Sequence, residues 1–394
     1  MSHSLGAVRM EVGRVFIAWS MAFLLLSVLG EEMTGLSQCD FPAIYNFGDS
    51  NSDTGGISAA FYPAGQPSGE TFFHEPAGRG SDGRLIIDFI AKRLRLPYLS
   101  AYLDSIGASF RHGANFATGG STIRQLNESF FLTGASPFSL DIQIVQFDQF
   151  KTRTSKLYNK AKKNSQRRNL PRPQDFSDAL YTFDIGQNDI AAGIRKSSSE
   201  NFGAVLPGII DQLASAVKHL HEQGARNFWI HNTGPIGCLP VTQHNYHHPM
   251  PGILDQHGCL IAQNDMAIEF NGQLKRQVTK LRTQLPGAAL TYVDIFAAKY
   301  KLISNPKEQG FVDARSICCG YHEDSNHVWC GHRDKINGTE IYAGSCEDPS
   351  KYISWDGVHY TEAANHWIAN HILNGSFADP PVPITHACHK RQSV

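Results

Sequence analysis

The 394-residue sequence lacks an excess of charge of either sign. It contains 35 Lys and Arg residues against 36 Asp and Glu residues, so its formal net charge is −1. A chain this balanced has no overall field that would recruit nucleic acid or an anionic membrane surface. The sequence also lacks internal repeats and a clear linker. It is nevertheless long enough to bury a sizeable hydrophobic core.

Long apolar runs are missing too. The run at residues 15–30 is shorter than the roughly 20 residues that a membrane-spanning helix requires. Arg9 and Arg14 precede this run, and small residues at its end offer cleavage sites. The pattern predicts a secretory signal peptide over residues 1–35, with an uncleaved signal anchor as the alternative. After cleavage we expect no stable membrane span.

The sequence contains only eight cysteines, which is an even number. In a chain with a secretory signal, an even set favours disulfides over metal ligation. The sequence does not determine the connectivity, and we predict only the short-loop pair Cys238 and Cys259. Asn127, Asn337 and Asn374 stand in Asn-x-Ser/Thr sequons. These are acceptors for glycosylation on the secretory route.

Short apolar runs alternate with helical patterns along the chain. Four runs rich in aromatic or β-branched residues predict buried strands, at residues 43–47, 179–185, 227–231 and 289–295. Residues 205–223 and 262–285 carry apolar side chains three and four positions apart, which predicts helices. Strands that alternate with helices imply parallel pairing and an α/β layer fold. In such sheets ligands bind at the carboxyl ends of the strands.

The sequence lacks the Gly-x-Ser-x-Gly pentapeptide around its most informative serine. Ser50 follows the first predicted strand in Phe47-Gly48-Asp49-Ser50, but Ser52 stands where the last glycine would be. A turn directly after a strand exposes a hydroxyl at the end of the sheet and directs backbone N–H groups to one point. Taken alone, Ser50 could equally be a turn residue that caps a helix.

A base for this hydroxyl stands more than 300 residues later, in Trp355-Asp356-Gly357-Val358-His359. An alcohol is a poor nucleophile at neutral pH and needs a base, which in turn needs an acceptor that fixes its tautomer. One loop can present Asp356 to one ring nitrogen of His359 and the other nitrogen to Ser50. An apparent helix over residues 361–372 would anchor this loop. The set predicts a serine hydrolase.

Two further segments offer donors to the oxyanion of an ester. Gly119 and Gly120 follow Asn115, and paired glycines permit a backbone amide to approach a ligand closely. Asn188 follows the predicted strand at residues 179–185 and can donate its side-chain amide. It could equally cap the next helix.

Four short blocks of the sequence resemble the plant GDSL esterase/lipase family of the SGNH hydrolase superfamily. They are Phe47-Gly48-Asp49-Ser50, Asn115-Phe116-Ala117-Thr118-Gly119-Gly120, Gly186-Gln187-Asn188-Asp189 and Asp356-Gly357-Val358-His359. Residues 232–240 are typical of the plant branch, and the similarity covers roughly residues 39–388. The leucine of Gly-Asp-Ser-Leu is Asn51 here, a usual variation in the early-nodulin-like subgroup, which the chain resembles most and which includes acetylesterases.

The resemblance implies one hydrolase domain over residues 36–394. Its fold would be a three-layer α/β/α sandwich with a mostly parallel, five-stranded, flavodoxin-like sheet. Ser50 would be the nucleophile, His359 the general base and then the general acid, and Asp356 the residue that orients His359.

The implied oxyanion hole consists of the N–H groups of Ser50 and Gly120 and the side-chain amide of Asn188, with Gly119 as the fallback for Gly120. The expected reaction is hydrolysis of a carboxylic ester through an acyl-serine, and it needs no metal or organic cofactor. The expected substrate is an acyl ester linked to carbohydrate.

The resembled subgroup includes acetylesterases that act on plant glycosides and cell-wall polysaccharides, which implies a substrate of this class. Polar and aromatic residues dominate the loops expected around the site, which favours a sugar-bearing, short-acyl ester over a triglyceride. They are His244, Asn245, Tyr246, His247, His248, Tyr321, His322 and Trp329. The expected location is extracellular, in the cell wall, or in the Golgi lumen. The oligomeric state is not predicted.

Other functions remain open at this point. The same acyl-serine would serve an acyltransferase or a lipase, because the shape and dryness of the site decide which molecules react. A catalytically idle, secreted binding glycoprotein is another alternative, in which the basic residues 151–173 would contact an acidic polymer. A metal hydrolase is disfavoured, since His322 and His327 are one position too far apart for His-Glu-x-x-His.

Overall fold

The computed structural model describes residues 38–129, 133–196, 199–244, 252–323 and 326–389. Its internal contacts divide the chain into Met1–Cys39 and Asp40–Val394, and the second unit contains the helices and strands given below. The predicted signal peptide lies outside the described residues. Within the described ranges, none of the helices combines the length and the apolar character needed to cross a bilayer.

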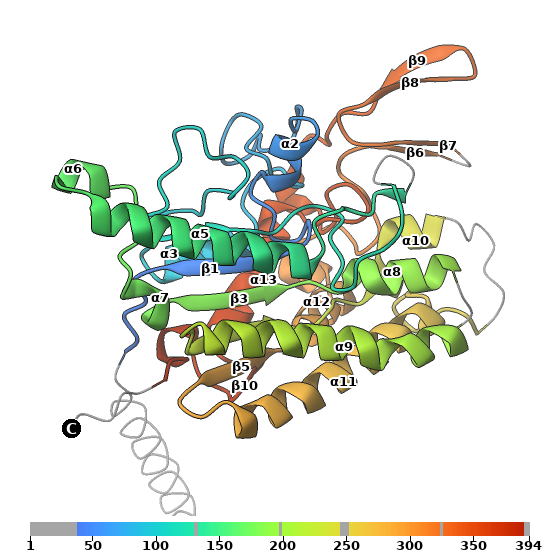
Figure 1. Ribbon diagram of the computed structural model, residues 1–394. Helices are drawn as coiled ribbons and strands as arrows, with labels where there is room; N and C mark the ends of the chain where they lie inside the picture. Colours follow the sequence, from blue (N-terminus) through green and yellow to red (C-terminus); the bar gives the residue numbers. More distant parts are fainter. Residues whose placement is uncertain (1–37, 130–132, 197–198, 245–251, 324–325, 390–394) are drawn as a thin grey trace, which may run out of the picture. The chain divides into compact units, whose positions relative to one another are not determined.

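A six-stranded sheet carries the fold (Figure 1). Five strands run parallel in the spatial order β2-β1-β3-β4-β5, which is the flavodoxin-like order. The predicted α/β fold is therefore confirmed. The sixth strand, β10, pairs antiparallel with β5 and was not expected. The bounds are β1 Ile44–Gly48, β2 Gly113–Asn115, β3 Leu180–Asp184, β4 Asn227–His231, β5 Ala289–Val293 and β10 Ala378–Asp379.

Helices cover both faces of this sheet. On one face α9 packs against α5, α8 and α11, and on the other α3 and α12 pack against α13 (Figure 1). The three predicted helices correspond to α9, α11 and α13. The bounds are α2 Gly56–Ala60, α3 Ile86–Arg93, α5 Leu140–Lys160, α6 Asn164–Arg167, α7 Asp175–Asp178, α8 Gln187–Lys196, α9 Ser199–Glu222, α10 Pro240–His244, α11 Ile261–Gln284, α12 Ile295–Ser304 and α13 Glu362–Leu373.

Aromatic side chains hold the buried strand β1 in place. The ring of Phe47 stacks on those of Phe116 and Phe183, with centroids 5.4 and 5.3 Å apart. Tyr45 meets Phe147 of α5 edge-on at 5.3 Å. All five rings are buried, and such pairs stabilise a core by about 0.5–1.5 kcal/mol beyond their burial. The turn that contains Ser50 therefore starts from a strand with little freedom to move.

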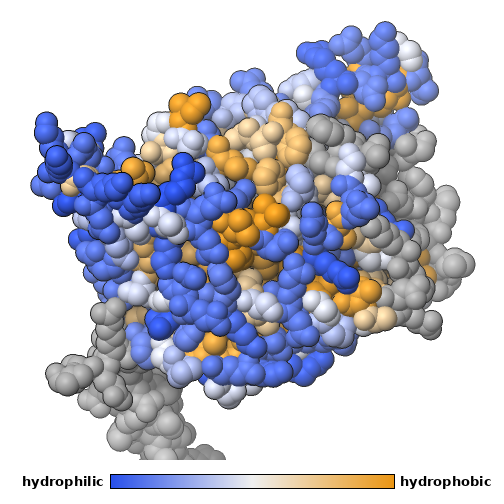
Figure 2. Space-filling view, viewed as in Figure 1, coloured by the Kyte–Doolittle hydropathy of each residue, from blue (hydrophilic) through white to orange (hydrophobic). Residues whose placement is uncertain are grey.

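The basic residues 151–173 form the end of α5, the short helix α6 and the segment after it. Figure 2 shows this part of the surface, at the upper left, as strongly hydrophilic. Seven of its basic side chains are exposed: Arg153, Lys156, Lys160, Lys162, Lys163, Arg168 and Arg172.

Two small hairpins lie between α12 and α13. They pair β6 (Tyr321–Glu323) with β7 (Asn326–Val328), and β8 (Arg333–Ile336) with β9 (Thr339–Tyr342). The second hairpin turns at Asn337 and Gly338, whose φ angles are 50° and 83°. An Asn-Gly pair with positive φ at both positions is a strong hairpin signal. The sequence analysis used these residues only as part of a sequon.

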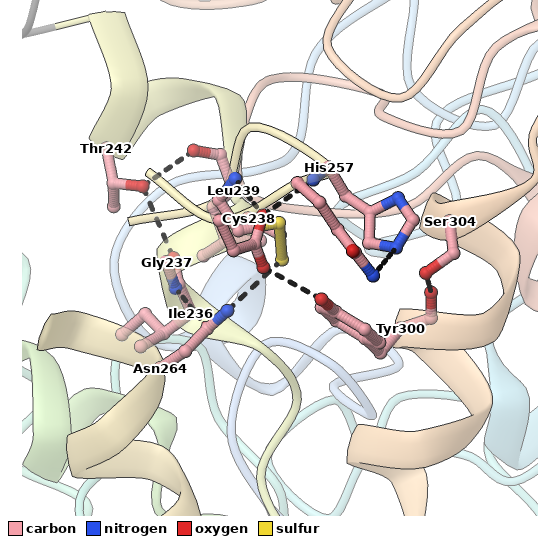
Figure 3. The surroundings of a disulfide bond; sticks show 12 residues. Ile236, Gly237, Cys238, Leu239, Thr242, His257, Asn264, Tyr300 and Ser304 are labelled. Carbon is pink, nitrogen blue, oxygen red and sulfur yellow. Dashed lines mark hydrogen bonds between the residues drawn. A yellow bond between two sulfur atoms is a disulfide. The ribbon is translucent and has the colours of Figure 1, made fainter. Parts of the chain in front are cut away.

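The predicted disulfide between Cys238 and Cys259 is confirmed (Figure 3). Asn264 of α11 supports it, because its Oδ1 accepts the N–H of Gly237 at 2.9 Å and its Nδ2 donates to Cys238 Sγ at 3.4 Å. Two more disulfides join Cys318 with Cys346 and Cys319 with Cys330. None of the cysteines that the structure describes is free.

Replacement of both Cys238 and Cys259 by alanine should lower the free energy of unfolding by about 3 kcal/mol, because the bridge closes a loop with a sequence separation of 21 residues and restricts the unfolded chain. Denaturant unfolding of this variant beside the parent protein measures the difference. An unchanged unfolding midpoint and slope would show that the bridge does not stabilise the fold.

Candidate active site

The predicted site residues gather at the carboxyl ends of the parallel strands. Ser50 lies two positions beyond the end of β1, Gly120 follows β2, and Asn188 stands in the first turn of α8, after β3. Because β2, β1 and β3 are neighbours in the sheet, these residues leave adjacent strands at the same edge.

The predicted residues differ from their neighbours in exposure. Each one is partly open to solvent, whereas the residues on one or both sides of it are buried. Buried Asp49 precedes Ser50, and buried Tyr360 follows His359. The residues that the sequence predicted to form the site are therefore all partly accessible: Ser50, Gly120, Asn188, Asp356 and His359.

Asp356 and His359 form the pair that the sequence predicted. His359 Nδ1 lies 2.6 Å from Asp356 Oδ2, while Asp356 Oδ1 accepts the N–H groups of Val358 and His359 at 2.9 and 2.7 Å. An ionised carboxylate only accepts hydrogen bonds, so Nδ1 carries the proton and Nε2 presents a lone pair. His359 Nε2 is buried and has no hydrogen-bond partner among the described residues.

Each member of this pair shifts the pKa of the other. Burial alone would lower the pKa of His359, but the Asp356 carboxylate outweighs it, and the pKa is raised above its ordinary value of 6.5. Burial alone would raise the pKa of Asp356, but His359 and the backbone N–H groups lower it. Asp356 therefore stays ionised over the pH range in which His359 titrates.

Segments stapled by disulfides hold the loop that carries this pair. The Val241 N–H, inside the Cys238–Cys259 loop, donates to the Gly357 carbonyl at 3.1 Å. The N–H groups of Cys318 and Cys319 donate to the carbonyls of Ser354 and Trp355 at 3.1 and 2.6 Å. The loop is thus fixed from two sides.

A buried amide network shapes the turn that contains Ser50. The side chain of Asn115 donates to the Ser52 carbonyl at 2.6 Å and to Thr54 Oγ1 at 2.9 Å, and its Oδ1 accepts from Asn46 at 2.7 Å. Asn46 also donates to Ser52 Oγ at 3.0 Å. The serine that replaces the usual glycine of the pentapeptide is therefore part of this network. The sequence analysis did not assign these roles to Asn46, Asn115 and Ser52.

The structure separates the two glycines that the sequence could not tell apart. The N–H of Gly119 donates to Asp53 Oδ2 at 2.7 Å and is therefore already engaged. Gly120 has a φ of +77°, and a Cβ there would lie 2.0 Å from the Gly134 carbonyl oxygen, so only glycine fits. The neighbouring Ser121 carbonyl accepts the side-chain amide of Asn188 at 2.9 Å. Gly120 and Asn188 are thus held beside each other.

Lys299 of α12 links the two halves of the site, and the sequence analysis missed it. Its Nζ lies 3.4 Å from Asn51 Oδ1 and 4.3 Å from the centre of the Tyr360 ring. Asn51 directly follows Ser50, and Tyr360 directly follows His359. The predicted nucleophile and the predicted base therefore belong to turns that share one contact. The sequence signal that could have indicated this role is a lysine within the mostly apolar residues 295–304.

The histidines of the metal alternative form a different arrangement. His322 and His327 face each other across the β6–β7 hairpin with their Nδ1 atoms 2.7 Å apart. Among the residues that the structure describes, no group of three or more His, Cys, Asp or Glu side chains is placed to hold a metal.

Four of the loop residues expected around the site lie outside the described residues: Asn245, Tyr246, His247 and His248.

A flavodoxin-like sheet with a histidine–aspartate pair near the carboxyl ends of its strands has the architecture of an α/β hydrolytic enzyme. The model of the family described as GDSL-like lipase/acylhydrolase matches residues 44–372. A GDSL esterase/lipase of Arabidopsis thaliana is 56% identical over 391 residues, which cover 99% of this chain and 100% of that protein.

Two further relatives agree with this match. GDSL esterase/lipase ACHE of Zea mays is 51% identical and covers 90% of both chains. GDSL esterase/lipase ENOD8 of Medicago truncatula is 47% identical and covers 90% of this chain and 91% of its own. The chain belongs to the GDSL esterase/lipase family, as the sequence motifs predicted. It is a carboxylic ester hydrolase, and its substrates are esters.

The raised pKa of His359 makes the pH dependence of the enzyme testable. With the neutral imidazole as the predicted base, kcat/KM should rise with pH through a midpoint above 6.5. Asp356→Asn removes the charge that raises this pKa, and it should move the midpoint down and lower kcat by roughly 10,000-fold through loss of the tautomer. Esterase rates measured from pH 4 to 9 give both values. An Asp356→Asn enzyme with the parent midpoint would contradict the pairing.

Proposed function

We propose that this enzyme hydrolyses short-acyl esters, above all acetyl esters, carried by a plant cell-wall polysaccharide or glycoside, with Ser50 as nucleophile. The observation that carries the proposal is the Asp356–His359 pair. Its His359 Nε2 has no hydrogen-bond partner in the described part of the chain, and its loop is tied through Lys299 to the turn of Ser50. This arrangement supplies the base and the orienting carboxylate that a serine nucleophile needs.

In the proposed first half-reaction, His359 Nε2 takes the hydroxyl proton while Ser50 Oγ bonds to the ester carbonyl carbon. The tetrahedral intermediate collapses, the bond to the leaving alcohol breaks, and His359 returns the proton to the alcohol oxygen. Water then adds to the acyl-serine and gives a proton to His359. The carboxylic acid leaves as Ser50 regains the proton.

The proposed oxyanion hole consists of the N–H groups of Ser50 and Gly120 and the side-chain amide of Asn188. The engagement of Gly119 by Asp53 supports Gly120 over Gly119. The 2.9 Å bond from Asn188 to the Ser121 carbonyl supports a fixed orientation of the amide, with its second hydrogen left for the substrate. Donors held in place before reaction stabilise developing charge without reorganisation.

Small hollows and polar walls support the choice of a short acyl group. The hollow against His359 and the one against Asn51 and Lys299 are narrow, with volumes of about 10 Å³ each. Near the β6–β7 hairpin, Trp329 exposes 46% of its surface, and a flat exposed ring suits a sugar face. Neither hollow has room for a long hydrocarbon chain, which supports a short acyl group.

The secretory route is part of the proposal. The described disulfides fit an oxidising compartment. The sequon residues Asn127, Asn337 and Asn374 are all exposed, so each can receive a glycan. We propose that residues 1–35 are removed as a signal peptide, and that the enzyme acts in the cell wall or in the Golgi lumen.

Ser50→Ala tests the nucleophile directly. It should lower kcat on 4-nitrophenyl acetate by roughly 10⁶-fold, because loss of the hydroxyl removes the covalent route. Ser105→Ala, at an exposed position, is the matched control and should retain parent activity. A fluorophosphonate should label the parent and Ser105→Ala but not Ser50→Ala. Parent turnover in Ser50→Ala would refute the assignment, and an unlabelled parent would favour the idle binding protein.

Acyl preference is a separate test. Acetate release from acetylated xylan and from 4-nitrophenyl acetate should exceed the hydrolysis of octanoyl and palmitoyl esters in kcat/KM, since the hollows at the site are small. Rates of Ser50→Ala on the same substrates give the background. A kcat/KM that increases with chain length would identify a lipase instead.

A further inference from the structure

A fully buried lysine lies beneath the candidate active site. Lys299 exposes only 3% of its surface although it carries an ammonium group. An unpaired ammonium is strongly destabilised by burial unless nearby groups compensate its charge. Lys301, two positions along the same helix, is exposed, so the burial of Lys299 is a property of that position on α12.

Two carboxylates compensate the buried charge. Burial lowers the pKa of Lys299, while the charges of Asp184 and Asp49 act in the opposite direction. Asp49 is itself buried, and burial together with Asp184 raises its pKa to about 7. Asp49 Oδ1 accepts two hydrogen bonds from Asn51, whereas its Oδ2 has no partner among the described residues. The Lys299 charge therefore stabilises the ionised form of the residue that precedes Ser50.

The second carboxylate is fixed from its other side. His231 Nδ1 lies 3.4 Å from Asp184 Oδ2, and His231 Nε2 accepts the indole N–H of Trp229 at 3.0 Å. An indole nitrogen only donates, so the proton of neutral His231 sits on Nδ1 and faces Asp184. Trp229 and His231 belong to β4, and Asp184 ends β3. Strands β3 and β4 thus hold the charged groups around Lys299 in place.

We propose that Lys299 is a positioning residue that holds the Ser50 turn and the His359 loop at a constant separation. Its Nζ contacts Asn51 Oδ1 at 3.4 Å and the face of Tyr360 at 4.3 Å, and these residues directly follow Ser50 and His359. Its positive charge offsets the negative charges of Asp49 and Asp184, and this attraction keeps the three side chains in one arrangement. The inference depends on the proposed roles of Ser50 and His359.

Lys299→Met tests this role, because methionine is also unbranched and removes only the ammonium and its charge. It should lower kcat by roughly 10- to 100-fold, since small displacements of reacting groups slow the chemical step, and leave KM near the parent value. Lys299→Arg restores charge and a donor and should recover part of kcat. Lys301→Met, at an exposed position, should behave as the parent. Steady-state rates on 4-nitrophenyl acetate give kcat and KM.

A second pair of variants covers the case in which Lys299→Met does not fold. Asn51→Ala and Tyr360→Leu each remove one partner of the ammonium, and each should lower kcat at unchanged KM. Parent kcat in folded Lys299→Met, or in both Asn51→Ala and Tyr360→Leu, would overturn the role of Lys299. A kcat loss that Lys299→Arg does not relieve would do the same. If Ser50→Ala were active, the proposed function itself would be wrong and this inference would fall with it.

Discussion

The hydrogen bond between Asp356 Oδ2 and His359 Nδ1 is the interaction on which the candidate site depends. It decides which ring nitrogen carries the proton, and so which nitrogen can accept one. Its geometry depends in turn on a loop whose backbone is bonded to two separate disulfide-bearing segments. The disulfides therefore restrict the loop that carries the predicted base as well as the unfolded chain.

Below this pair lies a set of buried ionisable groups that touch the site without forming its reactive atoms. Asp49 follows β1, and Asp184, Lys299 and His231 come from β3, α12 and β4. The charge of Lys299 offsets those of Asp49 and Asp184, which makes this group tolerable in a sheet whose other inward side chains are mostly apolar. Because the dielectric constant inside a protein is low, each of these charges also interacts strongly with the nearby residues of the site.

Much of the fold could be predicted from local patterns. The four predicted strands and the three predicted helices all occur, because aromatic and β-branched runs and apolar spacing are read over short windows. β2 was missed because it is three residues long and reads Gly-Ala-Asn. β10 has two residues and exists only because it finds an edge on β5. The Asn337-Gly338 pair is a hairpin signal in the sequence, but it was interpreted only as part of a glycosylation sequon.

The sequence by itself determined the class of fold, one disulfide and the chemical inventory of the site, since each of these depends on residue type and local spacing. The tertiary structure alone decided that the N–H of Gly119 is engaged by Asp53, that Ser52 belongs to an amide network, and that Lys299 reaches both turns. These facts depend on distances between segments far apart in the chain. Such distances follow from how the sheet and helices pack, and no short window of sequence contains them.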